Sequence, residues 1–219
     1  YAKYPRTLER DLKKAKKAGV DLVFTPTVAE IYPAGRQVSV KAGAIGEVLE
    51  GAFRPGHFDG VLTVVLKLLN IVRPSVAIFG RKDAQQLACI RRMVRDLNVD
   101  VDIVGAPIVR EEDGLAMSSR NRFLSPAERA SALVLSASLR AAAQEPAPAA
   151  ALAAASRLLT VAVDAGEIEV DYISVVNGTT MAPLPDDYTG PGLAVVAARV
   201  GTTRLIDNIE LVFPGPERP

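Results

Sequence analysis

Strand-like and helix-like patterns alternate between residues 57 and 107, and this alternation constrains the fold more than any other feature. HFDGVLTVVLKLLNIV (57–72) predicts an apolar helix, and SVAIFG (75–80) predicts a buried strand. DAQQLACIRRMVRDLN (83–98) predicts an amphipathic helix, and VDIVGAP (101–107) predicts another strand. The order indicates an α/β fold with a mostly parallel sheet, whose ligands would bind beyond the carboxyl ends of the strands.

The sequence before this region predicts a helix that stops at Gly19 and a short buried strand, DLVFTP, at residues 21–26. Four lysines lie on or near the outer face of the helix. We interpret them as a solvated surface, with a phosphate-binding patch as the alternative. They are Lys13, Lys14, Lys16 and Lys17.

The pattern changes after residue 110. Ser125, Pro126 and Glu128 predict a capping box at the start of an alanine-rich helix. Two prolines then indicate a joint between helices, and three strand-like runs predict an antiparallel sheet at the end of the chain. We therefore expect two domains, residues 1–110 and a small α+β domain over residues 111–219.

Composition excludes several classes of function. The chain has 26 basic and 25 acidic side chains, so its net charge of +1 gives no reason to expect nucleic acid or a membrane surface as a partner. The single cysteine, Cys89, rules out an internal disulfide framework and fits a reducing compartment, which predicts a cytoplasmic protein. The chain opens at Tyr1 without a signal peptide, and we expect it to be a piece of a longer chain.

Two polar clusters are candidate ligand sites. DGLAMSSRNRFLSPAER (113–129) combines hydroxyl and guanidinium groups, which suit an anion such as phosphate. GRKDAQQL (80–87) follows a predicted strand, where Lys82 offers a charge for phosphate and Asp83 an acceptor for ribose hydroxyls. Taken alone, the second cluster is weak evidence, and an ordinary surface turn is the favoured interpretation.

Four stretches together resemble the pantothenate synthetase family: YPRTLERDL (4–12), VLTVVLKLLNIVRPSVAIFGRKDAQQL (61–87), VREEDGLAMSSRNRFLSP (109–126) and GTTRLIDNI (201–209). The resemblance implies a Rossmann-like nucleotidylyl-transferase domain over residues 1–110 and a C-terminal lid domain over residues 111–219. It implies a ligase that activates pantoate with ATP as an acyl adenylate, releases pyrophosphate, and lets β-alanine displace AMP. It also implies assistance by Mg2+ and a homodimer.

The resemblance also implies roles for individual residues. Lys82 would bind phosphates, Asp83 the ribose and Gln86 the pantoate. Val109 and Met117 would contact adenine, largely through backbone groups. The implied catalytic set is Lys82, Ser118, Ser119 and Arg120. The implied ATP-binding set is Gly80, Arg81, Lys82, Asp83, Val109, Met117, Ser118, Ser119 and Arg120. No residue is implied as a metal ligand.

The sequence departs from the family pattern in several places. The family's His-x-Gly-His pair and a second pantoate-binding glutamine belong to an N-terminal part that this sequence lacks, so we expect an incomplete sheet. Arg81 replaces the usual Glu, and Ala84 a common aromatic residue. Two alternatives therefore stay open. Beside the pantoate-activating ligase, one alternative is a non-catalytic nucleotide-binding or assembly fragment of such an enzyme, and the other is a related adenylyl-transferring ligase for another acid substrate.

Single residues also have simpler interpretations. His57 is either a general acid–base group or a helix-start residue that bonds nearby backbone. Cys89 is expected in the core. Tyr4 is expected to pack, with the substrate mouth as the alternative. Asp207 and Asn208 are expected to be structural.

Overall fold

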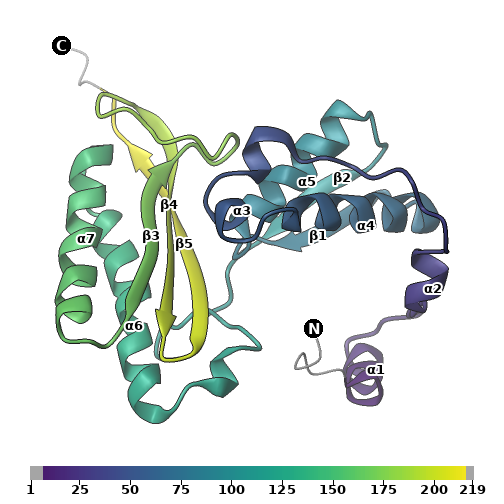
Figure 1. Ribbon diagram of the computed structural model, residues 1–219, viewed down its shortest axis with the longest axis horizontal. Helices are drawn as coiled ribbons and strands as arrows, with labels where there is room; N and C mark the ends of the chain where they lie inside the picture. The colour runs from purple at the N-terminus through teal and green to yellow at the C-terminus, as the bar shows by residue number, and fades with distance from the viewer. Residues whose placement is uncertain (1–6, 216–219) are drawn as a thin grey trace. The chain divides into compact units, whose positions relative to one another are not determined.

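The computed structural model describes residues 7–215, so the expectation for Tyr4 lies outside the described residues. Its contacts divide the chain into two compact units, Tyr1–Val38 and Ser39–Pro219. Each unit is described by itself, and Figure 1 gives the element labels used below.

The first unit contains two short helices, α1 (Leu8–Lys17) and α2 (Val28–Ile31). The four lysines of α1 are exposed, as expected of a solvated surface. The predicted strand at residues 21–26 is wrong: these residues form no strand, and Leu22 is 85% exposed. A strand needs a neighbouring strand for its backbone hydrogen bonds, and none of the described strands pairs with this segment.

The second unit opens with a βαβ arrangement packed against a further helix. The elements are η1 (Gly43–Gly46), α3 (Glu50–Phe53), α4 (His57–Val72), β1 (Val76–Gly80), α5 (Ala84–Asp96) and β2 (Asp102–Ala106). Strands β1 and β2 are parallel, with Gly80 opposite Ala106. This confirms the alternation predicted from the sequence and places the carboxyl ends of both strands at the same edge.

Helices α4 and α5 share an apolar core that covers one face of the β1–β2 sheet. Phe58 and Leu62 of α4 meet Ile90 of α5, and Phe79 of β1 packs against them. The two strands are not buried on both faces as predicted: the burial of β1 alternates, and Ile78 is 68% exposed.

Cys89 is fully buried in this core, as predicted. Burial raises the pKa of its thiol to about 11, so the thiol stays protonated near neutral pH. A protonated, buried thiol is a packing group and a poor nucleophile.

The C-terminal half is a three-stranded antiparallel sheet with two helices on one face (Figure 1). The elements are η2 (Asn121–Phe123), α6 (Pro126–Ala142), α7 (Pro148–Asp164), β3 (Glu169–Val176), β4 (Gly190–Val200) and β5 (Thr203–Phe213). The predicted capping box is confirmed, because Ser125 Oγ accepts from Glu128 N at 3.3 Å and Glu128 Oε2 accepts from Ser125 N at 2.8 Å.

A two-residue turn, Gly201 and Thr202, joins β4 to β5 and sets their register. Gly201 has φ of 55°, and a Cβ there would overlap the carboxylate of Glu128, so glycine suits this position on both counts. The register places Asn208 opposite Val195.

One buried cluster joins the two halves of the second unit. Ala88 of α5 packs with Val176 of β3, Met181, and Leu193 and Val195 of β4. A domain boundary at residue 110 therefore remains our proposal, based on the change from parallel to antiparallel sheet.

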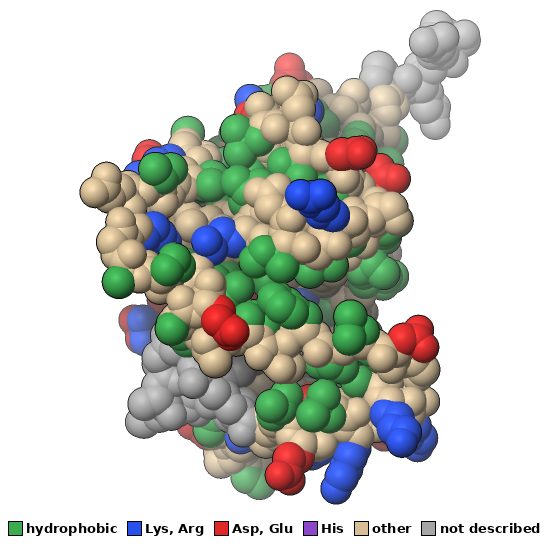
Figure 2. Space-filling model, turned by 90° about the vertical axis from the view of Figure 1, so that its right-hand side faces the viewer, with side chains coloured by type: hydrophobic (Ala, Val, Ile, Leu, Met, Phe, Trp, Pro, Cys, Tyr) green, Lys and Arg blue, Asp and Glu red, His purple; other side chains and the backbone are tan. Residues whose placement is uncertain are grey.

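The surface carries charges of both signs. Figure 2 shows Lys, Arg, Asp and Glu side chains interspersed with hydrophobic ones over the visible face. Among residues 7–215, no helix is long and apolar enough to cross a membrane.

Candidate active site

The turn between β1 and α5 carries the first candidate cluster. Gly80 is the last residue of β1, and a Cβ added to it would meet open space. Lys82 Nζ lies 4.0 Å from Asp83 Oδ1. Asp83 is the N-cap residue of α5, yet its side chain makes no capping hydrogen bond. The turn thus offers an ammonium and a carboxylate at the edge where an α/β sheet binds ligands.

The second candidate cluster lies in a narrow loop. Met117 N donates to Val109 O at 2.9 Å, so this N–H is already paired and only the other backbone groups of the two residues could meet adenine. Both side chains are more than half exposed. Ser118 Oγ accepts from Arg120 N at 3.2 Å, which folds the loop so that Ser119 and Arg120 are exposed.

The loop is held against α6 by its own acidic residues. Arg129 of α6 donates to Glu111 Oε2 at 2.5 Å and to Asp113 Oδ2 at 2.8 Å. Glu111 also accepts from Asn121 Nδ2 at 2.6 Å, and hydrogen bonds from Asn121 and Arg129 lower the pKa of its carboxyl. These ties keep Glu111 and Asp113 ionised and fix the start of the Ser118–Arg120 segment.

Arg54 lies within electrostatic range of residues from both candidate clusters. Partial burial lowers the pKa of Arg54, Glu50 opposes this effect, and the positive charge of Arg120 adds to it. Asp83 also acts on this pKa. Since such interactions weaken with distance, Arg54 is close enough to both Asp83 and Arg120 for their charges to act on it.

His57, the first residue of α4, belongs to the same site. Its backbone N donates to Arg54 O at 3.0 Å, which fits a helix-start residue. Burial, followed by the positive charge of Arg54, lowers the pKa of its imidazole. Charges of Asp83 and Arg120 also act on it. The shift favours the neutral form of this imidazole near neutral pH.

The two adjacent glutamines of α5 have different environments. Gln85 is buried, where its Oε1 accepts from Glu50 N at 3.0 Å and its Nε2 donates to Ile45 O and Val48 O at 2.8 and 2.7 Å. Gln86 is half-buried and makes no side-chain hydrogen bond to any residue from 7 to 215. Gln86 is therefore the glutamine whose amide is available to a ligand.

Arg81 is predicted to bind ATP, but its side chain bonds to other parts of the protein. Its Nε donates to Gly105 O at 3.0 Å and its Nη1 to Glu210 Oε1 at 2.6 Å. The guanidinium is thus engaged with β2 and β5, away from Lys82. Its role in ATP binding stays a prediction.

Arg54 is a candidate that the sequence reasoning missed. The available signal was its place in RPGHF, three residues before the single histidine and at a predicted helix start. Arg54 is a further cation within electrostatic range of Arg120, and cations from separate segments suit a polyphosphate.

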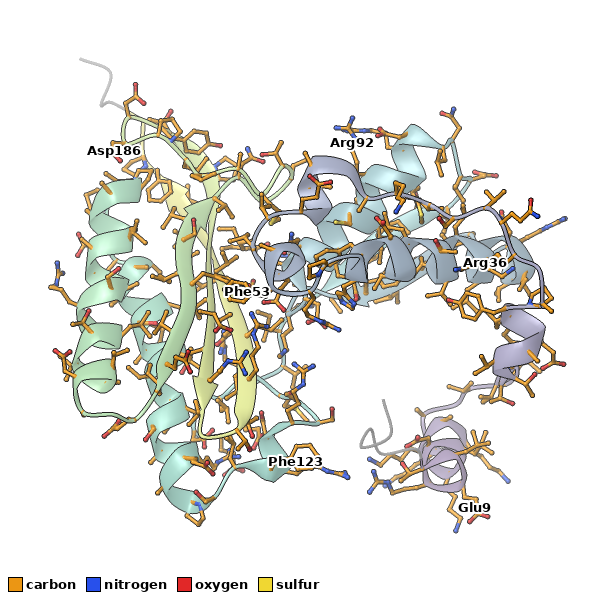
Figure 3. All side chains as sticks on the ribbon, in the orientation of Figure 1. Glu9, Arg36, Phe53, Arg92, Phe123 and Asp186 are labelled. Atoms are coloured by element: carbon orange, nitrogen blue, oxygen red, sulfur yellow. The ribbon has the colours of Figure 1, made fainter. Side chains whose placement is uncertain are left out.

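A charged cluster beside the site joins α3 to the C-terminal sheet. Arg204 of β5 bonds to Glu50 and to Asp171 of β3, and its guanidinium stacks over the ring of Phe53 at 5.3 Å. Figure 3 shows Phe53 at this junction between the helical part and the sheet. Burial alone would lower the pKa of Arg204, but its hydrogen bonds to Glu50 and Asp171 outweigh burial and raise this pKa.

Comparisons with known proteins agree with this fold. Residues 1–210 match the family model described as pantoate-beta-alanine ligase. The chain is 54% identical to the pantothenate synthetase of Thermobifida fusca, covering 97% of this chain and 75% of the relative. It is 48% identical to that of Streptomyces avermitilis, covering 96% and 78% of the two chains.

Solved structures show the same similarity. The crystal structure of pantothenate synthetase from Thermus thermophilus has a TM-score of 0.90 and 47% identity, covering 97% of this chain and 77% of that chain. The pantoate-beta-alanine ligase of Francisella tularensis, complexed with beta-gamma ATP and β-alanine, has a TM-score of 0.75 and 31% identity. It covers 94% of this chain and 70% of that chain.

The fold and site define a nucleotide-dependent α/β ligase. The chain belongs to the pantoate–β-alanine ligase family. As a member, it is an amide-forming ligase of pantothenate biosynthesis that condenses pantoate with β-alanine at the expense of ATP.

Proposed function

We propose that the chain carries out this ligation in two steps through a pantoyl adenylate, with ATP bound between the Lys82 turn and the Ser118–Arg120 loop. In the first step, a pantoate carboxylate oxygen attacks the α-phosphorus of ATP. The bond from this phosphorus to the bridging oxygen breaks, and pyrophosphate leaves with the electron pair. In the second step, the free amine of β-alanine forms the amide bond, AMP leaves as the acyl–oxygen bond breaks, and the amine loses a proton to solvent.

Stabilisation of charge is the main task of the site. Pyrophosphate gains negative charge as it leaves, and Lys82, Arg120 and the hydroxyls of Ser118 and Ser119 are suited to receive it. The observation that carries the proposal is that adjacent residues of β5 hold both segments: Asn208 donates to Lys82 O at 2.8 Å, and Asp207 accepts at 2.7 Å from Arg110, which leads into the Ser118–Arg120 loop.

The remaining ligand contacts follow from the same arrangement. The open Cβ side of Gly80 leaves room for the nucleotide, and Asp83 accepts from the ribose hydroxyls. Val109 and Met117 contact adenine. Gln86 donates from its amide to pantoate, which supports this acid over others as the substrate.

Magnesium fits this site as an ion carried by the nucleotide. Residues 7–215 contain no cluster of three or more His, Cys, Asp and Glu side chains that could hold a metal. Mg2+ bound mainly through substrate phosphates and water needs no such cluster. Asp83 is the nearest carboxylate to Lys82 and would face the ion's water shell; the ion would neutralise part of the phosphate charge.

The proposed setting is a cytoplasmic homodimer. The homodimer rests on the family resemblance. The cytoplasm is supported by the single cysteine, which lies buried and protonated in the core and forms no disulfide.

Exchange of labelled pyrophosphate into ATP, dependent on pantoate and without β-alanine, tests the adenylate route. Lys82→Ala is expected to lower the exchange rate at least about 100-fold because it removes a cation from the leaving group. Lys67→Ala in α4 is the matched control and is expected to exchange at the normal rate. Normal exchange in Lys82→Ala would refute the assignment. ATP binding without exchange in the unmodified chain would favour the non-catalytic alternative.

A further inference from the structure

Asn208 of β5 holds the backbone of the turn that carries Lys82. Its Nδ2 donates to Arg81 O at 3.0 Å and to Lys82 O at 2.8 Å, across 127 and 126 positions of sequence. The side chain is buried, with the residue only 4% exposed. One amide group from the C-terminal sheet therefore satisfies two consecutive carbonyls of the proposed phosphate-binding turn.

The turn has few other anchors. Arg81 N donates to Ala106 O at 2.8 Å, which continues the ladder between β1 and β2 by one residue. No other described residue donates to Arg81 O or Lys82 O. The Arg81 side chain also ties the turn to Gly105 O and Glu210, but the carbonyls of Arg81 and Lys82, and with them the backbone that carries the Lys82 side chain, are held by Asn208.

The neighbouring residue holds the other nucleotide segment. Arg110 donates to Asp207 Oδ2 at 2.7 Å and to Asp207 Oδ1 at 3.1 Å, and its Nη1 also donates to Gly114 O at 3.1 Å. Asp207 Oδ1 in turn accepts from Asn208 N at 2.8 Å. Arg110 opens the loop that leads to Ser118, so adjacent residues of β5 hold both segments that face the phosphates.

We infer that Asn208 is a positioning residue for ATP: it fixes the Lys82 turn from the C-terminal sheet without touching the nucleotide. The inference rests on the proposed role of Lys82. It gives Asn208 a function in the reaction, beyond the structural role expected from the sequence. A displacement of the turn by about 1 Å is enough to lower catalysis substantially.

The test compares Asn208→Asp and Asn208→Ala in the full chain. Aspartate keeps the shape but places a carboxylate oxygen against two carbonyl oxygens, and alanine removes the donor without adding charge. Both are expected to lower kcat/KM for ATP about 10- to 100-fold, with KM for β-alanine changed less than about 2-fold. Asn70→Asp, an exposed position on α4, is the matched control and is expected to keep normal kinetics.

A double-mutant cycle separates positioning from a purely structural role. If Asn208 acts through Lys82, then Asn208→Asp should lower kcat/KM for ATP less than about 3-fold in a chain that already carries Lys82→Ala. Equal losses in both backgrounds would overturn the inference, as would normal kinetics in Asn208→Asp. If Lys82→Ala alone leaves kcat/KM for ATP unchanged, the proposed function fails first.

Thermal unfolding of each variant sets the assay temperature below the lowest midpoint. Loss of the fold in both Asn208 variants at all temperatures would also overturn the inference, because the residue would then serve the fold and not the turn. Retained folding with the expected kinetic loss would support it.

Discussion

Arg204 of β5 donates two hydrogen bonds of 2.7 Å to the carboxylate of Glu50 in α3, 154 positions earlier in the sequence. Both side chains are largely buried, with exposed fractions of 16% and 10%. Tyr172 of β3 adds a hydrogen bond of 2.9 Å to the same carboxylate. This ion pair joins the parallel and antiparallel parts of the second unit beside the candidate site.

Removing one partner of this pair should destabilise the fold strongly. Glu50→Ala leaves the buried Arg204 guanidinium with only its hydrogen bond to Asp171, and we expect the free energy of unfolding to fall by about 3–5 kcal/mol. Urea denaturation measures it. The exposed pair Arg92–Asp96 on α5 supplies the control, because Asp96→Asn should leave the unfolding midpoint unchanged. Similar losses at both positions would contradict a special role for the buried pair.

Arg54 should contribute to nucleotide binding although it lies outside the two predicted clusters. Arg54→Ala removes one cation that faces the phosphates, and we expect KM for ATP to rise about 10-fold, since a charge-assisted hydrogen bond is worth about 1.5–3 kcal/mol. Steady-state kinetics at saturating pantoate measure this effect. Arg92→Ala removes an exposed arginine from α5 and should leave KM for ATP as it is. An unchanged KM in Arg54→Ala would remove this residue from the site.

The two adjacent glutamines of α5 should give opposite results. Gln86→Ala should raise KM for pantoate with little change in stability, because Gln86 has no hydrogen bond to another described residue. Gln85→Ala leaves buried partners unsatisfied and should cost about 1–3 kcal/mol of unfolding free energy. Its KM for pantoate should stay near normal at a temperature where it is folded. A raised KM for pantoate in Gln85→Ala, together with a loss of stability in Gln86→Ala, would show that Gln85 binds pantoate and Gln86 is structural.

His57 should make stability depend on pH in a defined window. Because its folded pKa lies below the usual 6.5, the unfolded chain binds more protons, and stability falls as the pH is lowered through 6.5 toward the folded pKa. His57→Gln should lose less stability than the parent chain over this window. Denaturation at about pH 7.5 and about pH 5.5 measures the difference. Equal losses in the two chains would show that His57 is not the group responsible.

Local patterns were enough to predict most elements of the fold. The predicted helix at residues 57–72 coincides with α4, and the capping box at Ser125 forms as expected. The strand at residues 21–26 failed because strand formation depends on a partner that a local pattern does not contain. Predictions were therefore correct where local interactions form the element and failed where the element needs a partner distant in sequence.

The same limit applies to the site. Lys82 and Arg120 stand in recognisable short motifs and could be proposed from sequence. Arg54, at the end of α3, comes near Arg120 only through the tertiary fold, and Asn208 reaches the Lys82 turn only through the folding of the C-terminal sheet. No spacing in a single sequence indicates that residues 126 positions apart share a hydrogen bond.

The two-residue turn at Gly201 has a consequence for the distant phosphate site. It fixes which residue of β5 stands opposite Val195, and a slip of one residue would turn the Asn208 amide to the opposite face of the sheet. The Lys82 turn would then lose its donor although no residue near the nucleotide had changed. A lengthened β4–β5 hairpin would thus lower activity as an active-site substitution does. Deletions or insertions in this turn should reduce activity as much as substitution of Lys82 itself.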